Sequence, residues 1–461
     1  MSLNKSSKRI LILSAALSMF MASSVYAETV SLDLPDAMQR AFATNPSLGV
    51  AAYNYQSAQA KFNAARESYG PSISFGHNFA RGGLHTEQVL GTGTGVDHSY
   101  SNNASVSMPI FTGGKLEGSV KSAKANYNIA KLGVQQSYND LRDTVYVGYY
   151  TVLQTQNLEK LTAESVTRLE DHLKNVKAQF DVGVVAKVDV LRSEVELADA
   201  VQQHLSARNA ASVAMSNMNR IIGLPLDTEL VLKDSLDYKE CAYTLPYCID
   251  YSLKNRPEYE IARQSVEAAK GALIAAKSGH MPQVSANASN RWGGKSGNSW
   301  PGNDDSTWGV GIALSMNIFD SGVTWSKIHG AEADLHKAEE NYRDTVNLLN
   351  LDGRTKYNNL RESEERIKSS KSALAAAEED YRIAKLRYMN GVGTNTDVLD
   401  AQVALTKAQT NHLQAVYDYN TNKVALDNSM GVAMVPPVQF KPPKYEPLEP
   451  IKPLKVKTVK R

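Results

Sequence analysis

The chain is poor in cysteine, in net charge and in long apolar runs, and each shortage excludes a class of protein. Of its 461 residues only Cys241 and Cys248 are cysteine, and neither lies near the N-terminus, so we expect no lipid anchor of the bacterial lipoprotein kind. A net charge of +2 gives no reason to expect a nucleic-acid or acidic-polymer partner. After residue 27, no uninterrupted apolar stretch approaches the roughly 20 residues that a spanning helix needs. A membrane protein with this sequence would therefore enter lipid through β-strands.

The chain also lacks the motifs by which common enzymes are recognised. It contains no G-x-x-x-x-G-K-[ST], H-E-x-x-H, G-x-S-x-G or C-x-x-C segment. The glycine run at residues 91–95 has no helical pattern after it, which favours a flexible loop. His77, His85 and His98 lie close in sequence, but polar residues of a sheet and its loops explain them better than a metal site does. We predict no catalytic residue, no cofactor and no metal site.

The N-terminal residues indicate export. Three basic residues precede an apolar run at residues 10–20, and "VYA" at residues 25–27 fits the small-residue rule for signal cleavage. Residues 1–27 are therefore predicted to be a signal peptide. Export also bears on the two cysteines, which lie seven residues apart and are predicted either to form a disulfide or to remain inert free thiols.

An internal repeat sets the organisation of the chain. Residues 45–74 align with residues 256–285, so that the two prolines of the first segment correspond to the two prolines of the second, each 211 residues later. Further on, "SMPIFTGG" aligns with "SMNIFDSG" and "VGVVAKVDVL" with "NGVGTNTDVL", each 208 residues later. The chain is therefore one unit duplicated.

Each repeat is predicted to begin with a helix and a pair of strands. The helices cover about residues 35–69 and 247–279, and each ends before a proline. In "NASVSMPIF" and "WGVGIALSMNIF" every second residue is apolar, which predicts strands with one apolar face. All four tryptophans gather around the second strand pair, as in the aromatic belt of a membrane barrel.

The second half of each repeat is predicted to be a long helical hairpin. Residues 114–181 and 322–389 contain no proline and would each form a helix of about 90 to 100 Å. A turn at residues 181–187, and again at residues 390–396, returns the chain along another helix that ends near a glycine. An apolar seam spaced 3, 4, 3, 4 occurs in both repeats and is typical of a coiled coil; its residues are Val166, Leu169, Leu173, Val176 and Phe180, and Leu374, Ala377, Tyr381, Ala384 and Tyr388.

Two strand pairs give four strands per chain, which is too few for a closed barrel. An open sheet would leave unpaired backbone groups at two edges, and hydrocarbon does not tolerate these. Several chains would therefore share one barrel. The alternative is an ordinary soluble sheet, which export and the attached helices make less favourable.

These segments together resemble the TolC-like outer-membrane efflux proteins. The resemblance rests on the duplicated "NP" and "RP", on "PIFTGG" and "NIFDSG", and above all on "RYMNGVGTNTDVLDAQVAL", and it spans about residues 28–435. It implies an α+β membrane protein whose four strands contribute to a twelve-stranded transmembrane barrel shared by a homotrimer. A long coiled-coil α-helical barrel would extend into the periplasm. The implied function is an outer-membrane exit duct for tripartite efflux or type I secretion, with outer-membrane lipid, a periplasmic adaptor and an inner-membrane pump of the RND or ABC type as partners.

The domain boundaries follow from the repeat. We expect a first repeat at residues 28–227, a linker at residues 228–246, a second repeat at residues 247–435 and a tail at residues 436–461. The tail is rich in proline and lysine and predicts an extended or disordered segment. A periplasmic coiled-coil adaptor or scaffold is the alternative function, but it would lack the two strand pairs. A self-standing porin would be nearly all strand.

The resemblance also places a gate at the periplasmic end of the hairpins. By position in the motif, Asp397 and Asp400 are the acids that ring the closed opening, and three copies would favour cations and repel anions. In the alignment of the repeats, Asp189 is equivalent to Asp397, but Arg192 is equivalent to Asp400. Arg192 is therefore predicted to pair with a neighbouring acid and latch the closed state. Gly393 occupies the place of a basic residue that is common in the family.

Two further interpretations apply to the same turns. Thr394 followed three residues later by Asp397 predicts a capping box, which explains Asp397 better than it explains Asp400. A general acid–base pair is disfavoured because no histidine, lysine or nucleophile accompanies these acids. The turns are also the predicted contact surface for the partner complex, through Gly183, Val184, Gly391, Gly393 and Thr394.

Overall fold

The computed structural model describes residues 30–84, 95–236, 238–294 and 306–432. The predicted signal peptide and the Pro/Lys-rich tail lie outside these residues. The described chain divides into two compact units, of which the first contains residues 30–46, Tyr138–Ile249 and Asp352–Val432, and the second contains Ser47–Ser137 and Asp250–Leu351. Within the described ranges, no helix combines the length and the hydropathy needed to cross a membrane.

The first helical segment of each repeat is two helices, where one was predicted. Helix α2 (Leu34–Thr44) is followed by α3 (Pro46–Glu67), and α6 (Leu245–Asn255) is followed by α7 (Pro257–Lys277). The residue before each proline has an extended backbone, with ψ at 125° for Asn45 and 128° for Arg256. Proline disfavours the helical conformation of the residue before it, so the break recurs at the same place in both repeats.

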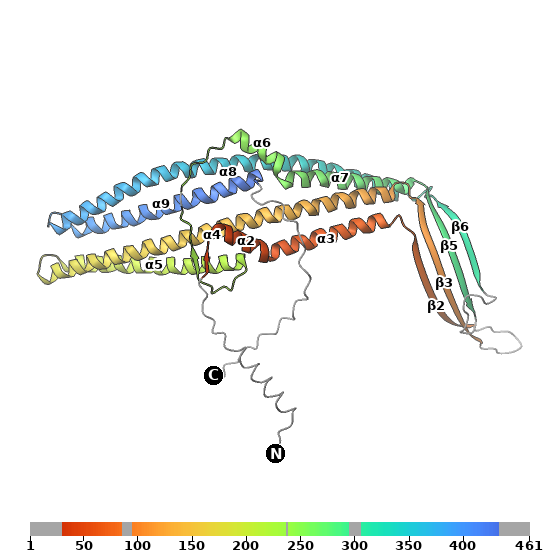
Figure 1. Ribbon diagram of the computed structural model, residues 1–461, viewed down its shortest axis with the longest axis horizontal. Coiled ribbons are helices and arrows are strands. Elements are labelled where there is room, and N and C mark those ends of the chain that lie inside the picture. The colour runs from red at the N-terminus through yellow and green to blue at the C-terminus, as the bar shows by residue number, and fades with distance from the viewer. Residues whose placement is uncertain (1–29, 85–94, 237, 295–305, 433–461) are drawn as a thin grey trace, which may run out of the picture. The chain divides into compact units, whose positions relative to one another are not determined.

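The second unit contains a four-stranded antiparallel sheet in the order β2-β3-β5-β6 (Figure 1). Its strands are β2 (Ser72–Leu84), β3 (Gly95–Phe111), β5 (Gln283–Gly294) and β6 (Thr307–Ser315). Both strand pairs are thus where the alternation predicted them. The predicted alternation continued to Ile318, but β6 ends at Ser315 because its partner strand begins at Gln283, directly after Pro282.

The two faces of this sheet differ in chemistry. One face presents Ile73, Val106, Ala288 and Val310 in a row of paired residues across the four strands. The neighbouring row on the opposite face is Ser72, Ser107, Asn287 and Gly311. The hydroxyl of Ser107 donates to Asn287 Oδ1 at 2.8 Å, so this polar row is tied laterally. The period-two pattern therefore produces one apolar and one polar face, as predicted.

Four long helices form two hairpins. Helix α4 (Lys115–Asp181) turns into α5 (Lys187–Ile222), and α8 (Val323–Met389) turns into α9 (Asn395–Met430). Figure 1 shows α5 running back along α4 and α9 running back along α8. The returning helices end at Gly223 and Gly431, whose φ angles of 72° and 71° are left-handed and suit glycine.

The remaining elements of the first unit are short. Strand β1 (Val30–Leu32) pairs in parallel with β4 (Leu230–Leu232), and the hydroxyl of Tyr149 donates to Asp234 beside this pair at 2.7 Å. Tyr149 is fully buried and belongs to the packed core of this unit. In the second unit a single 3-10 turn, η1 (Ser278–His280), joins α7 to β5.

Cys241 and Cys248 are both buried free thiols, so the disulfide alternative is not realised in the structure. Burial and the nearby Cys241 both raise the pKa of the Cys248 thiol. A thiol with a raised pKa carries little reactive thiolate, which agrees with the alternative of two inert thiols.

Candidate functional site at the hairpin tips

The two hairpin turns share one backbone design. In the first, the amide of Val184 donates to the carbonyl of Gln179 at 2.9 Å, and Gly183 has a φ of 79°. In the second, the amide of Val392 donates to the carbonyl of Arg387 at 2.9 Å, and Gly391 has a φ of 73°. A left-handed residue with this six-residue bond is a Schellman ending, so both turns need glycine where the sequence provides it.

The second turn begins its helix with a capping box, as predicted. The hydroxyl of Thr394 accepts from the amide of Asp397 at 3.1 Å, and the Asp397 carboxylate accepts from the amide of Thr394 at 2.9 Å. The bond from the Thr394 amide, followed by that from its side chain, holds the pKa of Asp397 below its usual range. Ala186 caps the corresponding helix in the first turn and offers no side-chain bond. Asp400 is exposed one turn further along α9 and takes no part in the cap.

A buried polar cluster joins the two hairpins just behind the turns. The ring nitrogen Nε2 of His172 on α4 lies 2.7 Å from Oδ1 of Asn395, the first residue of α9. Asn395 Oδ1 also accepts from the Ser193 hydroxyl at 3.3 Å, and its Nδ2 donates to the carbonyl of Asp189 at 3.1 Å. Asn395 and Ser193 are almost fully buried, and His172 is only 8% exposed. The start of α9 is therefore anchored to both helices of the other hairpin.

Burial lowers the pKa of His172, while its bond to Asn395 opposes this effect and Lys385 adds to it. A neutral imidazole carries one proton, and the contact with an amide oxygen requires that proton to be on Nε2. His172 also lies against the ring of Tyr388, with ring centroids 5.3 Å apart. The imidazole therefore donates to Asn395 and also packs against the ring of Tyr388.

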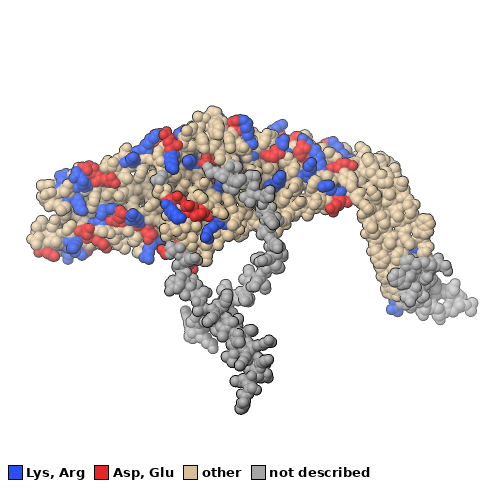
Figure 2. All heavy atoms as spheres, in the orientation of Figure 1, with Lys and Arg blue, Asp and Glu red and all other residues tan. Residues whose placement is uncertain are grey.

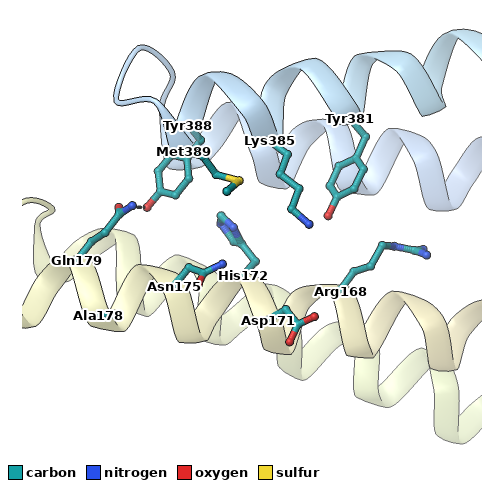
Figure 3. Close-up of a pocket in the computed structure, with 10 residues that line it drawn as sticks. All are labelled: Arg168, Asp171, His172, Asn175, Ala178, Gln179, Tyr381, Lys385, Tyr388 and Met389. Atoms are coloured by element: carbon teal, nitrogen blue, oxygen red, sulfur yellow. Dashed lines mark hydrogen bonds between the residues drawn. The ribbon is translucent and has the colours of Figure 1, made fainter.

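A small cavity opens beside this cluster, between α4 and α8 (Figure 3). Its volume is about 280 Å³, and Arg168, Asp171 and Lys385 bring charged groups to it. At one end the hydroxyl of Tyr388 donates to Gln179 Oε1 at 2.7 Å, which makes a second polar bond between the hairpins.

Apolar side chains fill the space around these polar contacts. Tyr388 contributes its ring to a buried cluster that draws on all four helices and whose other members are Leu173, Val176, Val190, Ala384, Val398 and Ala401. Leu173, Val176, Ala384 and Tyr388 belong to the predicted seam, which is therefore confirmed at its inner positions. Phe180, the last seam residue of the first repeat, is 40% exposed.

Arg192 contacts a hydroxyl in the structure, and no acid within the described residues pairs with it. Its Nη1 donates to the hydroxyl of Thr396 at 2.9 Å, and Thr396 is the neighbour of Asp397 in the opposite hairpin. This contact joins Arg192 to the second turn through a hydroxyl group, and the pairing of Arg192 with an acid in a closed-state latch stays a prediction. Gly393 packs closely, because a Cβ there would lie 3.0 Å from the backbone nitrogen of Tyr388. A basic side chain at this position would therefore require the turn to move.

The sequence did not single out His172, Asn395, Ser193 or Gln179. Their only local signal is polarity at helix positions whose neighbours are apolar, and such a signal cannot name a partner. The polar bonds join residues more than 200 positions apart in sequence.

The comparisons with known proteins agree with this architecture. The family model described as "Outer membrane efflux protein" matches residues 37–224 and 248–432. The chain belongs to this family. It is 23% identical over 431 residues to outer membrane protein TolC of Escherichia coli (strain K12). This alignment covers 87% of this chain and 82% of that protein. It is 25% identical to outer membrane protein TolC of Vibrio cholerae, over 91% of this chain and 94% of that one.

Solved structures show the same fold. The CmeC outer membrane channel of Campylobacter jejuni superposes with a TM-score of 0.77 at 15% identity, covering 86% of this chain and 85% of that one. The outer-membrane channel OprN gives a TM-score of 0.76 at 20% identity, covering 86% and 89%. The resemblance inferred from the sequence and its fold class are therefore confirmed. The family member described here is an outer-membrane protein and an exit duct of the TolC type, which excludes the alternative of a periplasmic adaptor.

Proposed function

We propose that this chain works as a homotrimer, a passive duct whose twelve-stranded barrel spans the outer membrane and whose helical hairpins form a gated periplasmic tunnel. An inner-membrane pump and a periplasmic adaptor would open the gate by contact with the hairpin tips. The observation that carries the proposal is the sheet, which has one apolar face and two unpaired edges. The duplicated hairpins and the tip bonds support the gate.

The edges of the sheet require a partner of the same kind. β2 and β6 each pair on one side only, and all nine residues of β6 are exposed. Trp308 and Val310 on β6 are each 77% exposed, and Ile73 on β2 is 80% exposed. Lipid would cover these side chains, but only another strand can satisfy the backbone groups at each edge. Pairing β2 of one chain with β6 of the next closes the sheet, and three chains give twelve strands.

The tip bonds supply a latch for the closed state. His172 with Asn395, Gln179 with Tyr388, and Arg192 with Thr396 all join one hairpin to the other. Separating the hairpins would expose these groups to water one pair at a time, so each bond contributes a modest part of the barrier. Asp397 and Asp400 lie on the exposed side of the same turns, where three copies would gather their charge around the opening.

No chemistry is assigned to the duct itself. Among the described residues, no group of three or more potential ligands from His, Cys, Asp and Glu could hold a metal ion. Among the perturbed ionisable groups at the tips, His172 and Tyr388 make hydrogen bonds between the hairpins, and Asp397 takes part in the cap of α9. We therefore propose that the protein is not an enzyme and that its specificity depends on the pump that supplies it.

The latch is tested by single-channel conductance in planar bilayers. Tyr388→Phe removes the hydroxyl that reaches Gln179, and we expect the resting conductance to rise severalfold. Tyr381→Phe is the matched control, because Tyr381 lines the same cavity but its hydroxyl makes no hydrogen bond to the opposite hairpin among the described residues. Equal resting conductance in the wild type and both variants would exclude this bond from the gate.

The acidic ring is tested separately. Replacing Asp397 and Asp400 together by alanine should weaken the block of channel current by multivalent cations and lower the preference for cations. If block and preference stay at wild-type values, these acids do not face the opening. Crosslinking in cells, followed by identification of the captured inner-membrane pump, tests the proposed partners and decides between the RND and ABC types.

A further inference from the structure

Among the strand residues whose side chains are described, the polar face of the sheet carries a single charged side chain. Figure 2 shows few charged side chains over the strands in view, in contrast with the helices. Only two charged side chains occur among the strand residues whose side chains are described, namely Arg81 on β2 and Arg291 on β5. The strand register places them on opposite faces, because Arg81 shares its face with Ile73 and Arg291 shares its face with Ser289.

Arg291 stands among small and neutral neighbours. It pairs with Asn103 on β3 and with Thr307 on β6, and Gly76 on β2 lies opposite Asn103. The residue two places before it, Ser289, pairs with Gly309. Arg291 is exposed, and no acid among the described residues forms an ion pair with it. Among the strand residues whose side chains are described, its guanidinium therefore projects from a wall that offers hydroxyl and amide groups but no countercharge.

The position of Arg291 along the strand is equally specific. It lies three residues before the end of β5, at the end of the sheet where the hairpins turn, and the helices leave from the opposite end. In a barrel whose helices extend into the periplasm, this end faces the outside of the cell. The next residue, Trp292, lies on the apolar face and packs against Phe75 with ring centroids 6.1 Å apart, which suits the boundary between lipid and water.

We infer that Arg291 is a selectivity residue, and that its three copies form a cationic ring inside the outer mouth of the barrel. The inference rests on the proposed trimer, in which the polar face lines the lumen. Rings of arginine favour anions in a pore, as rings of acids favour cations. The solutes that the ring assists are therefore anionic, and small multivalent anions bind there from the outside. The two ends of the duct thus have opposite preferences, with acids at the periplasmic tips and arginines at the outer mouth.

The test is ion selectivity of the full-length protein in planar bilayers, measured as reversal potential under a KCl gradient. Arg291→Gln should raise the ratio of potassium to chloride permeability by roughly two- to fivefold, and Arg291→Glu should raise it further. Arg291→Gln should also weaken block by citrate added on the side of the strand hairpins. Arg81→Gln is the matched control, since it removes the same charge from the opposite face and should leave both measurements unchanged.

A second variant keeps the test decisive if removal of the arginine impairs insertion. Arg291→Cys can be modified in the inserted channel, and the native Cys241 and Cys248 are buried. A negatively charged thiol reagent should shift the reversal potential toward potassium, and a positively charged one should restore the wild-type value. Channels that conduct normally but ignore both reagents, with Arg291→Gln unchanged, overturn the cationic ring and leave the duct intact. Wild-type protein that forms neither trimers nor channels overturns the duct itself.

Discussion

The partly buried carboxyl group of Asp143 is expected to destabilise the helical unit at neutral pH. Burial raises the pKa of Asp143 from 3.8 to about 6, although Arg142 and Asn428 act in the opposite direction. Its Oδ2 accepts a hydrogen bond from the side-chain nitrogen Nδ2 of Asn428 on α9, while Oδ1 is buried without a partner. Burial also raises the pKa of Asp427, and one of its carboxylate oxygens is likewise buried without a partner. Arg142 lowers the pKa of both carboxyl groups, but burial outweighs it in each case.

The sign of the effect follows from the raised pKa. The folded state binds the proton of Asp143 more tightly than the unfolded chain does, so folding is favoured below pH 3.8 and is weakened as the pH rises toward about 6. At about 1.4 kcal/mol for each pKa unit, the cost at pH 8 would be about 3 kcal/mol. Because Asp143 is partly exposed, solvent screening reduces this to about 1 to 2 kcal/mol. Asp143→Asn removes the charge and keeps an acceptor for Asn428.

The measurement is thermal unfolding of the detergent-solubilised protein, followed by the helical circular dichroism signal at one fixed scan rate. We expect Asp143→Asn to raise the Tm at pH 8 by on the order of 1 to 3 °C and to have little effect at pH 4. Asp199→Asn, which neutralises an exposed acid on α5, is the control and should change neither value. A lower Tm for Asp143→Asn at pH 8 would refute the reasoning, since it would mean that the carboxylate stabilises the fold through Arg142.

Five further substitutions test the tips and the helix packing. Thr394→Ala should destabilise the start of α9 by about 1 kcal/mol, and Ala186→Thr should give α5 the capping box it lacks, both read from hydrogen exchange of the first-turn amides. Gly271→Val should disrupt the packing of α7 and lower the Tm strongly, because a Cβ there would lie 2.6 Å from a backbone nitrogen of α4. Gly330→Ala is the control, because its Cβ enters open space and the Tm should not change. Since the pKa of His172 is lowered, the contact between the hairpins should weaken as the pH falls below 6.5, and hydrogen exchange at the tips should then become faster. His172→Gln should abolish this pH dependence.

The long-range order of the elements could be predicted because the repeat displays each feature twice. The ends of α4 and α8, at Asp181 and Met389, fall where the apolar spacing stops and a glycine turn begins. The breaks before Pro46 and Pro257 were missed because the apolar pattern continues on both sides of each proline. The backbone before a proline decides the break there, and side-chain periodicity does not record it.

The polar contacts between hairpins could not be predicted from the sequence. In the sequence, Asn395 cannot be distinguished from any other residue at the start of a helix. Its contribution to the structure comes from hydrogen bonds with three residues of the other hairpin. Arg192 illustrates the same difficulty, since charge alone suggested an acid and the geometry provided the hydroxyl of Thr396. Side-chain reach across a four-helix contact depends on the relative rotation of the helices, which sequence spacing within one helix does not fix.

The two repeats use equivalent tip positions in different ways, and this difference has a consequence for gating. Thr394 and Asp397 satisfy each other in the second turn, so the Asp397 carboxylate is already engaged and Asp400 is the acid whose carboxylate is uncommitted to a cap. The first turn has no such cap, and its Asp189 instead offers a backbone carbonyl to Asn395. Asn395 is the first residue of α9, so a movement of that helix strains the cap and the bonds to the other hairpin together. Opening would therefore involve the start of α9 as one cooperative unit, in which the charged ring moves with the buried contacts that hold it.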